Sequence, residues 1–150
     1  MIPLTQHWEE TSMPLVDPTR LQASANADPE FRMAARYWNA TLSLESPSRA
    51  LRVEIVDGQV SSCRESETGR PATIIVVASD VGWVQFLATV PGPFYQDLLG
   101  GCVQHHGFQV NGDMLSLSAY YQATQRLFAV MRALRASTGE ARTGAGGEER

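Results

Sequence analysis

The hydrophobic positions of the chain follow two periods, one typical of helices and one typical of strands. Near the N-terminus, Asp17-Pro18 and Asp28-Pro29 predict two helix starts. An aspartate caps free backbone N–H groups there, and a proline in the first turn loses no needed donor. The second helix is expected to be short, because the pattern turns to strict alternation after Tyr37.

Alternating apolar and polar residues then predict three strands in succession, over residues 38–44, 51–55 and 60–64. Asp57-Gly58 stands between the second and third strands. It predicts a hairpin, because glycine accepts the positive φ of a two-residue turn. Residues 72–78 are β-branched and apolar on both faces, which predicts a strand covered on both sides and central in the sheet.

Further helices and a last strand are expected in the second half of the chain. After a cap at Ser79 or Asp80, apolar residues fall at helical spacing as far as Val90, just before the breaker at residues 91–93. A short helix is predicted over residues 94–99, a strand over 107–112 and the longest helix over 114–134. From Ser137 the composition is too poor in apolar residues for a core, which predicts a disordered tail.

This order of elements predicts an α+β fold, in which helices cover one face of a five-stranded, mainly antiparallel sheet. A chain of 150 residues is long enough for one domain with a real core. We divide it into an N-terminal extension with a short helix over residues 1–27, a domain over 28–136 and the tail over 137–150.

Composition and charge exclude several functions. All 12 basic residues are arginine, and without lysine there is no Schiff-base nucleophile, pyridoxal-phosphate anchor or phosphate-loop motif. A formal net charge of -4 gives no general attraction to nucleic acid. The first ten residues lack the basic region of a signal peptide, and no apolar stretch approaches the roughly 18 residues of a membrane span. We therefore expect a cytoplasmic protein without membrane insertion, in which Cys63 and Cys102 are unbridged.

Three segments resemble the sterol carrier protein type 2 family by their order and spacing. They are residues 51–60 around the hairpin, residues 72–80 running into Trp83 and Leu87, and residues 108–114 with Gly112 in the turn before the long helix. The likeness extends from about residue 31 to 134 and fits a bacterial single-domain member. It implies that the sheet and helices enclose an apolar tunnel for sterols, fatty acids, acyl-CoA or other apolar molecules. This chain is longer than the compact carrier form between Pro93 and Gly112.

The resemblance implies a ligand site where the central helices, the last strand and the start of the long helix meet. Apolar helical stripes by themselves are more often plain packing, so the residue pattern alone favours a filled core. Residues 100–107 contain three glycines and are the expected lid. The predicted lining is Trp83, Phe86, Phe94, Tyr95, Leu98, Leu99, Phe108, Met114, Leu117 and Tyr121.

Few residues are candidates for catalysis or for metal binding. His105 and His106 are adjacent, and neighbours on an extended chain point apart, so one of them at most could act as a general base, with Asp97 or Asp113 as its orienter. Too few other ligands exist for a metal site, and no cofactor is predicted. Five helical arginines are expected to be solvated, with one exception facing a carboxylate or phosphate at the tunnel mouth; they are Arg32, Arg36, Arg126, Arg132 and Arg135.

Three functions remain open from the sequence. The leading one is a non-enzymatic module that carries an apolar small molecule or presents it to a partner enzyme. The alternative is a small cyclase or isomerase of a polyketide or terpenoid that uses the same cavity. The third is a cavity-free partner domain that uses its first 30 residues or its long helix as an interaction surface.

Overall fold

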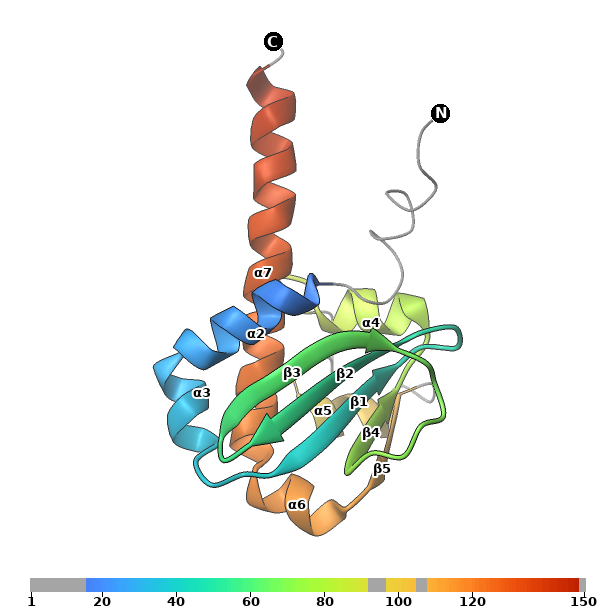
Figure 1. Ribbon diagram of the computed structural model, residues 1–150. Helices are drawn as coiled ribbons and strands as arrows, with labels where there is room; N and C mark the ends of the chain where they lie inside the picture. The colour runs from blue at the N-terminus through green and yellow to red at the C-terminus, as the bar shows by residue number, and fades with distance from the viewer. Residues whose placement is uncertain (1–15, 92–96, 105–107, 149–150) are drawn as a thin grey trace.

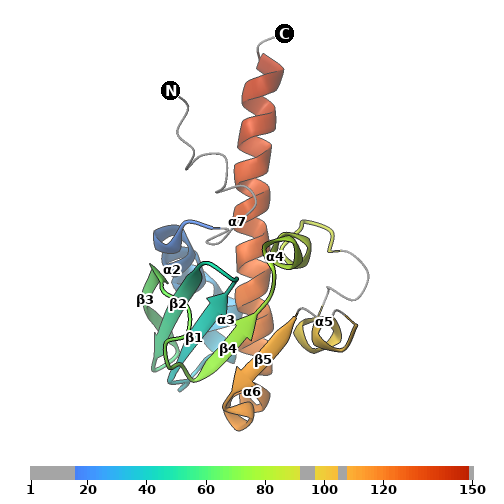
Figure 2. The ribbon, with the colours of Figure 1, turned by 90° about the vertical axis from the view of Figure 1, so that its right-hand side faces the viewer.

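The computed structural model describes residues 16–91, 97–104 and 108–148, and confirms the α+β fold (Figure 1). The sheet has five strands, β1 (Ala40–Glu45), β2 (Ala50–Val56), β3 (Gln59–Ser66), β4 (Ile74–Val77) and β5 (Gln109–Gly112). Figure 2 shows the strands side by side from β3 to β5, with the long helix α7 (Tyr121–Glu148) on one side of the sheet. The core consists of the inward side chains of the strands and of the helix side chains that pack on them.

The strand order is β3-β2-β1-β4-β5, so the middle strand is β1. The prediction that residues 72–78, which form β4, are central in the sheet is therefore wrong. β4 runs parallel to β1, and the other three pairings are antiparallel. A pattern that is apolar on both faces predicts that both faces of the strand are covered, and it does not fix the place of the strand in the sheet. Ile74 and Val76 are buried and Ile75 and Val77 are half-buried, so one face of β4 is fully covered and the other is partly covered.

The predicted hairpin between β2 and β3 is confirmed. Asp57 and Gly58 have φ values of 50° and 77°, so both turn residues lie in the left-handed region. The Gly58 N–H donates to the carbonyl of Trp38, and a Cβ at this glycine would lie 2.8 Å from the carbonyl oxygen of Ala35. The turn therefore packs directly on the backbone that leads into β1.

Both Asp-Pro helix starts are confirmed. Asp17 caps α2 (Pro18–Ala27), and Asp28 caps the short helix α3 (Pro29–Ala34). α2 lies along the edge strand β3, where the Asn26 side chain accepts a hydrogen bond from the Val60 N–H and donates one to the Val60 carbonyl. This side chain takes the place of a neighbouring strand, and so protects the sheet edge.

Two helices differ from the sequence prediction in their bounds. α4 (Asp80–Phe86) ends before Val90, which is 83% exposed. α5 (Leu98–Gln104) passes through Gly100-Gly101, where we had expected a helix to stop. Of the helix predicted over residues 94–99, residues 94–96 lie outside the described ranges.

The long helix is broken where the sequence predicts continuity. α6 (Met114–Ala119) ends at Tyr120, whose φ of -118° and ψ of 31° are not helical, and α7 begins at the next residue. The Tyr120 ring stacks on Trp38 at 5.0 Å between centroids, and the Trp38 indole N–H donates to Ser116 Oγ. These contacts with the segment that leads into β1 explain a break that local propensity does not predict. α7 continues as helix to Glu148 and projects beyond the sheet (Figure 1), while the division into an extension, a domain and a tail stays a prediction.

Asp28 links the N-terminal helices to α7, and its loss should destabilise the fold. Arg126 Nε and Nη2 donate to the two Asp28 carboxylate oxygens, both at 2.8 Å, and the Phe31 N–H donates to the same carboxylate. Asp28→Asn keeps a capping oxygen but removes the ion pair, and should lower the free energy of unfolding by about 1–2 kcal/mol in urea denaturation. Glu30→Gln is the control, since Glu30 is 74% exposed and its pairing with Arg126 should contribute little.

The effect of Asp28→Asn should depend on pH. The hydrogen bond from Arg126 lowers the pKa of Asp28 below its ordinary value. A depressed folded-state pKa means that the stabilisation is complete above the unfolded value of about 3.9, and is lost as the pH falls through the folded value. The difference in the free energy of unfolding between Asp28→Asn and the unchanged chain should therefore shrink at acid pH. If this difference stayed constant down to the lowest pH at which the protein is folded, the ion pair would be contradicted.

Candidate functional site

Four aromatic rings form a cluster between the sheet and the helices, which we call the aromatic cluster. It consists of Trp83 and Phe86 from α4, Phe108 just before β5, and Phe128 from α7. All four side chains are at most 2% exposed. Phe86 lies 4.9 Å from Phe108 and 4.8 Å from Phe128 between ring centroids, the latter pair edge to face. Trp83 lies between 5.3 and 6.3 Å from the other three rings.

The start of α4 fixes Trp83 in this cluster. Ser79 caps the helix by accepting a hydrogen bond from the Gly82 N–H at 3.0 Å. The Trp83 indole N–H donates to the carbonyl of Glu45 at the end of β1, at 2.8 Å and fully buried. A buried indole N–H needs such a partner, so this bond holds the ring system in one orientation against the sheet.

α5 lies beside the cluster and is attached to α7 by side chains that bind its first N–H groups. The Tyr121 hydroxyl donates to the Asp97 carboxylate and accepts from the Leu99 N–H. Gln125 Oε1 accepts from the Leu98 N–H at 3.2 Å. Burial first, and then the bond to Asp97, raise the pKa of Tyr121 above its ordinary value, so the phenol keeps its proton at neutral pH. Leu98 itself is fully buried and anchors α5 in the core.

Arg132 lies at the edge of the aromatic cluster. Its Nε donates to the carbonyl of Phe86 at 2.8 Å, and its Cζ lies 4.7 Å from the centroid of the Phe86 ring. Burial lowers the pKa of Arg132 from its ordinary value. An arginine keeps its charge even so, because its ordinary pKa is above 12. The cluster therefore has a half-buried cation on one side.

The structure brings together some of the predicted lining residues and not others. Trp83, Phe86, Leu98, Phe108 and Leu117 all belong to the buried core, and Tyr121 packs against it. Leu99 is 47% exposed and Met114 is 44% exposed, so these two lie at the surface instead. Phe94 and Tyr95 lie outside the described residues. Phe128 was absent from the predicted lining, although it continues the helical stripe of Leu117 and Tyr121.

Of the catalytic candidates His105, His106 and Asp97, only Asp97 lies in the described part of the chain, so this call stays a prediction. Asp97 already accepts hydrogen bonds from the Tyr121 hydroxyl and the Gly100 N–H, which makes it a cap of α5. His105 and His106 lie outside the described residues. Among residues 16–91, 97–104 and 108–148, no group of three His, Cys, Asp or Glu residues could hold a metal ion. Within the same ranges, no helix is long and apolar enough to cross a membrane.

The two cysteines are free, as predicted. Cys63 is buried in β3, where desolvation raises the pKa of its thiol to about 12. Burial also raises the pKa of Cys102, which lies in α5. Both thiols are therefore protonated at neutral pH and are weak nucleophiles.

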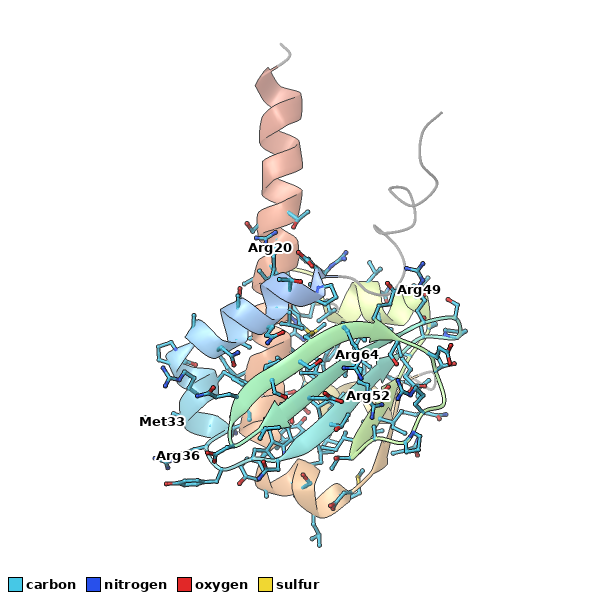
Figure 3. The ribbon with its side chains drawn as sticks, viewed as in Figure 1. Arg20, Met33, Arg36, Arg49, Arg52 and Arg64 are labelled. Carbon is cyan, nitrogen blue, oxygen red and sulfur yellow. The ribbon has the colours of Figure 1, made fainter. Side chains whose placement is uncertain are left out.

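Sequence reasoning missed a polar network on the other face of the sheet. Glu45 is only 6% exposed, and its carboxylate accepts hydrogen bonds from the Ser43 hydroxyl at 2.6 Å and the Gly69 N–H at 3.3 Å. Arg52 Nη2 donates to the carbonyl of Pro71. Figure 3 shows the labelled Arg52 and Arg64 on this face, turned away from α7. The alternating pattern predicts polar residues here, but it does not predict that the loop before β4 folds over them.

Comparison with known proteins gives the fold of the chain. No family model matches the sequence, and no curated protein matches it significantly. Among solved structures, a crystal structure of sterol carrier protein 2 is similar at a TM-score of 0.66 and 20% identity, over 78% of this chain and 94% of that one. The solution structure of a conserved hypothetical protein from Thermus thermophilus is described as possibly a sterol carrier protein. It is similar at a TM-score of 0.62 and 21% identity, over 83% of this chain and 92% of that one.

A third solved structure, of a UbiJ-SCP2 ubiquinone synthesis protein, has a TM-score of 0.51 and 16% identity, over 76% of this chain and 90% of that one. The matches cover most of this chain and nearly all of each structure. The chain therefore has the sterol carrier protein 2 fold, with its five-stranded mixed sheet and one layer of helices.

Proposed function

We propose that the chain binds an apolar small molecule between the sheet and helices α4, α5 and α7, as a carrier or presenting module. The observation that carries this proposal is the aromatic cluster, which is buried at the point where these elements meet in the sterol carrier protein 2 fold. Such rings offer a large apolar surface, worth about 25 cal/mol for each Å² that a ligand removes from water. The ligand classes that fit are lipids, sterols, acyl chains and apolar polyketides or terpenoids.

α5 is the element that moves in this proposal. The four rings are almost fully buried, so a ligand reaches them only after a covering element has shifted. α5 is seven residues long, and Gly100 and Gly101 each weaken it by about 1 kcal/mol relative to alanine. Opening it breaks the hydrogen bonds that the Leu99 and Leu98 N–H groups donate to Tyr121 and Gln125, and it exposes Leu98. Binding of the ligand must contribute more free energy than this opening costs.

A presenting role is part of the proposal. One protein with this fold is described as a ubiquinone synthesis protein, which favours a role beside the enzymes of a synthesis. A carrier that shields an apolar intermediate from water and delivers it to a partner enzyme would need a binding site and no catalytic group.

Saturable uptake of fluorescent fatty acid and sterol probes tests the proposal. Tyr121→Phe removes the hydroxyl that ties α5 to α7, and should speed stopped-flow uptake of the better probe by about thirtyfold, since two hydrogen bonds are lost and each contributes about 1 kcal/mol. Tyr37→Phe is the matched control, because Tyr37 is 73% exposed and far from α5 in sequence. The absence of saturable uptake of any probe by the unchanged chain would refute the binding function.

A further inference from the structure

An apolar surface is exposed at the end of the molecule where α3 leads into β1. Met33 is 70% exposed and Tyr37 73%, and Val56, at the end of β2, is 57% exposed. α6 lies at the same end and presents Leu115, which is 84% exposed (Figure 1). Scattered apolar residues on a surface are ordinary, but a group of them marks an interaction site. We call these four residues, together with their charged neighbours Arg36 and Asp57, the Tyr37 surface.

Tyr37 is held in a backbone conformation that does not suit its side chain. Its φ of 72° lies in the left-handed region, which favours glycine. The turn requires this conformation, because the Trp38 N–H donates to the carbonyl of Ala35 at 2.8 Å. The ring has the Arg36 guanidinium 5.8 Å from its centroid and is largely open to solvent. Glycine would form the same turn with less strain, so the folding of a single chain does not explain the tyrosine.

Arg36 and Asp57 are neighbours that do not pair with each other. A Cβ on Gly58 would lie 3.2 Å from Cα of Arg36, so the hairpin turn places Asp57 beside that arginine. Both side chains are exposed, and neither forms an ion pair among the described residues. Arg49 and Arg126, in contrast, each have a carboxylate partner. The Tyr37 surface therefore carries one unpaired charge of each sign.

We propose that two copies of this chain associate through the Tyr37 surface about a twofold axis. In such a dimer the same surface meets itself, so Arg36 of each copy pairs with Asp57 of the other. The apolar side chains around these pairs are removed from water in the same step. Arg32 and Asp113 add one further exposed charge of each sign at this end. This balance fits a second copy better than an anionic membrane, which attracts clusters of basic residues. The inference does not depend on the proposed function.

Sedimentation velocity of the full chain tests the dimer. Between about 1 and 200 µM, in the range where the affinities of weak homodimers lie, the average mass should rise from 16.4 kDa toward twice that value. Arg36→Glu and Asp57→Arg should each weaken association at least about tenfold, because like charges then face each other. The double variant exchanges the two charges and should restore the affinity to within about threefold. Arg20→Glu is the matched control, since Arg20 is exposed on α2, away from the Tyr37 surface (Figure 3).

Tyr37→Gly separates association from folding. Glycine adopts this φ without strain, so the variant should keep the melting temperature of the dilute protein while it weakens the dimer at least about tenfold. Val90→Ser, at an exposed site beyond α4, should leave the dimer unchanged. A chain that stays monomeric up to about 200 µM would overturn the inference, as would a dimer that Arg36→Glu and Tyr37→Gly leave intact. A monomer that sediments with phosphatidylglycerol vesicles through Tyr37 would overturn it in favour of a membrane-binding surface.

Discussion

Replacing Gly112 with alanine is expected to destabilise the protein by about 3–5 kcal/mol, enough to unfold much of a marginally stable domain. Gly112 has a φ of 116°, a conformation that side chains rarely allow. A Cβ there would lie 2.2 Å from the carbonyl oxygen of Thr73 and 3.1 Å from Cα of Ile74. That carbonyl already accepts the Asp113 N–H at 2.8 Å, so the backbone cannot move away without loss of the β4–β5 pairing.

Gly69→Ala is the matched control for Gly112→Ala. Gly69 also has a positive φ, of 81°, but nothing lies within 4 Å of the Cβ that alanine would add. Gly69→Ala should lower the free energy of unfolding by only about 1–2 kcal/mol, because alanine is strained in the left-handed conformation. Urea denaturation followed by circular dichroism measures both variants. Equal losses in the two would show that the close approach of β5 to Thr73 does not exist.

The parts of the fold that the sequence predicted correctly depend on neighbouring residues. The caps at Asp17 and Asp28 need only an acceptor and the N–H groups two or three residues ahead. The hairpin at Asp57-Gly58 likewise needs only two residues that accept positive φ. These local interactions are complete within one turn, so their residue types carry enough information.

The parts that were wrong depend on contacts between distant segments. The break at Tyr120 accompanies its stacking on Trp38, which precedes the first strand. The pattern of residues 114–134 is continuous across this break, so no local signal marks it. The middle position of β1 likewise depends on which strands pair, and the apolar pattern of β4 reports which faces are covered and not its place in the strand order.

The candidate site was predictable in its residue types but not in its packing. The aromatic residues of α4 and Phe108 were expected together, and the structure places them in one cluster. Leu99 was expected in the same lining because it follows Leu98, but successive residues of a helix point in different directions. The register of α5 decides which of the two is buried, and the sequence around Gly100 does not determine that register.

Trp83→Ala is expected to cost about 3–5 kcal/mol, because it removes the largest ring of the aromatic cluster. The lost hydrogen bond should add little, since the Glu45 carbonyl also accepts the Ala78 N–H at 3.0 Å and stays paired. The penalty is then mainly the cavity left against three phenylalanine rings. Val81→Ala is the control in the same helix, because Val81 is 66% exposed and should change the midpoint of unfolding little.

The cavity of Trp83→Ala should also bind a small aromatic molecule. Apolar cavities lined by such rings stay dry and take up ligands of matching size. Millimolar indole should therefore raise the melting temperature of Trp83→Ala, because a ligand that binds only the folded state stabilises it. It should not do so for Val81→Ala. A melting temperature of Trp83→Ala that does not respond to indole would mean that the cluster collapses around the missing ring. Trp83 would then contribute only to packing, and a ligand would have to bind at another place against the helices.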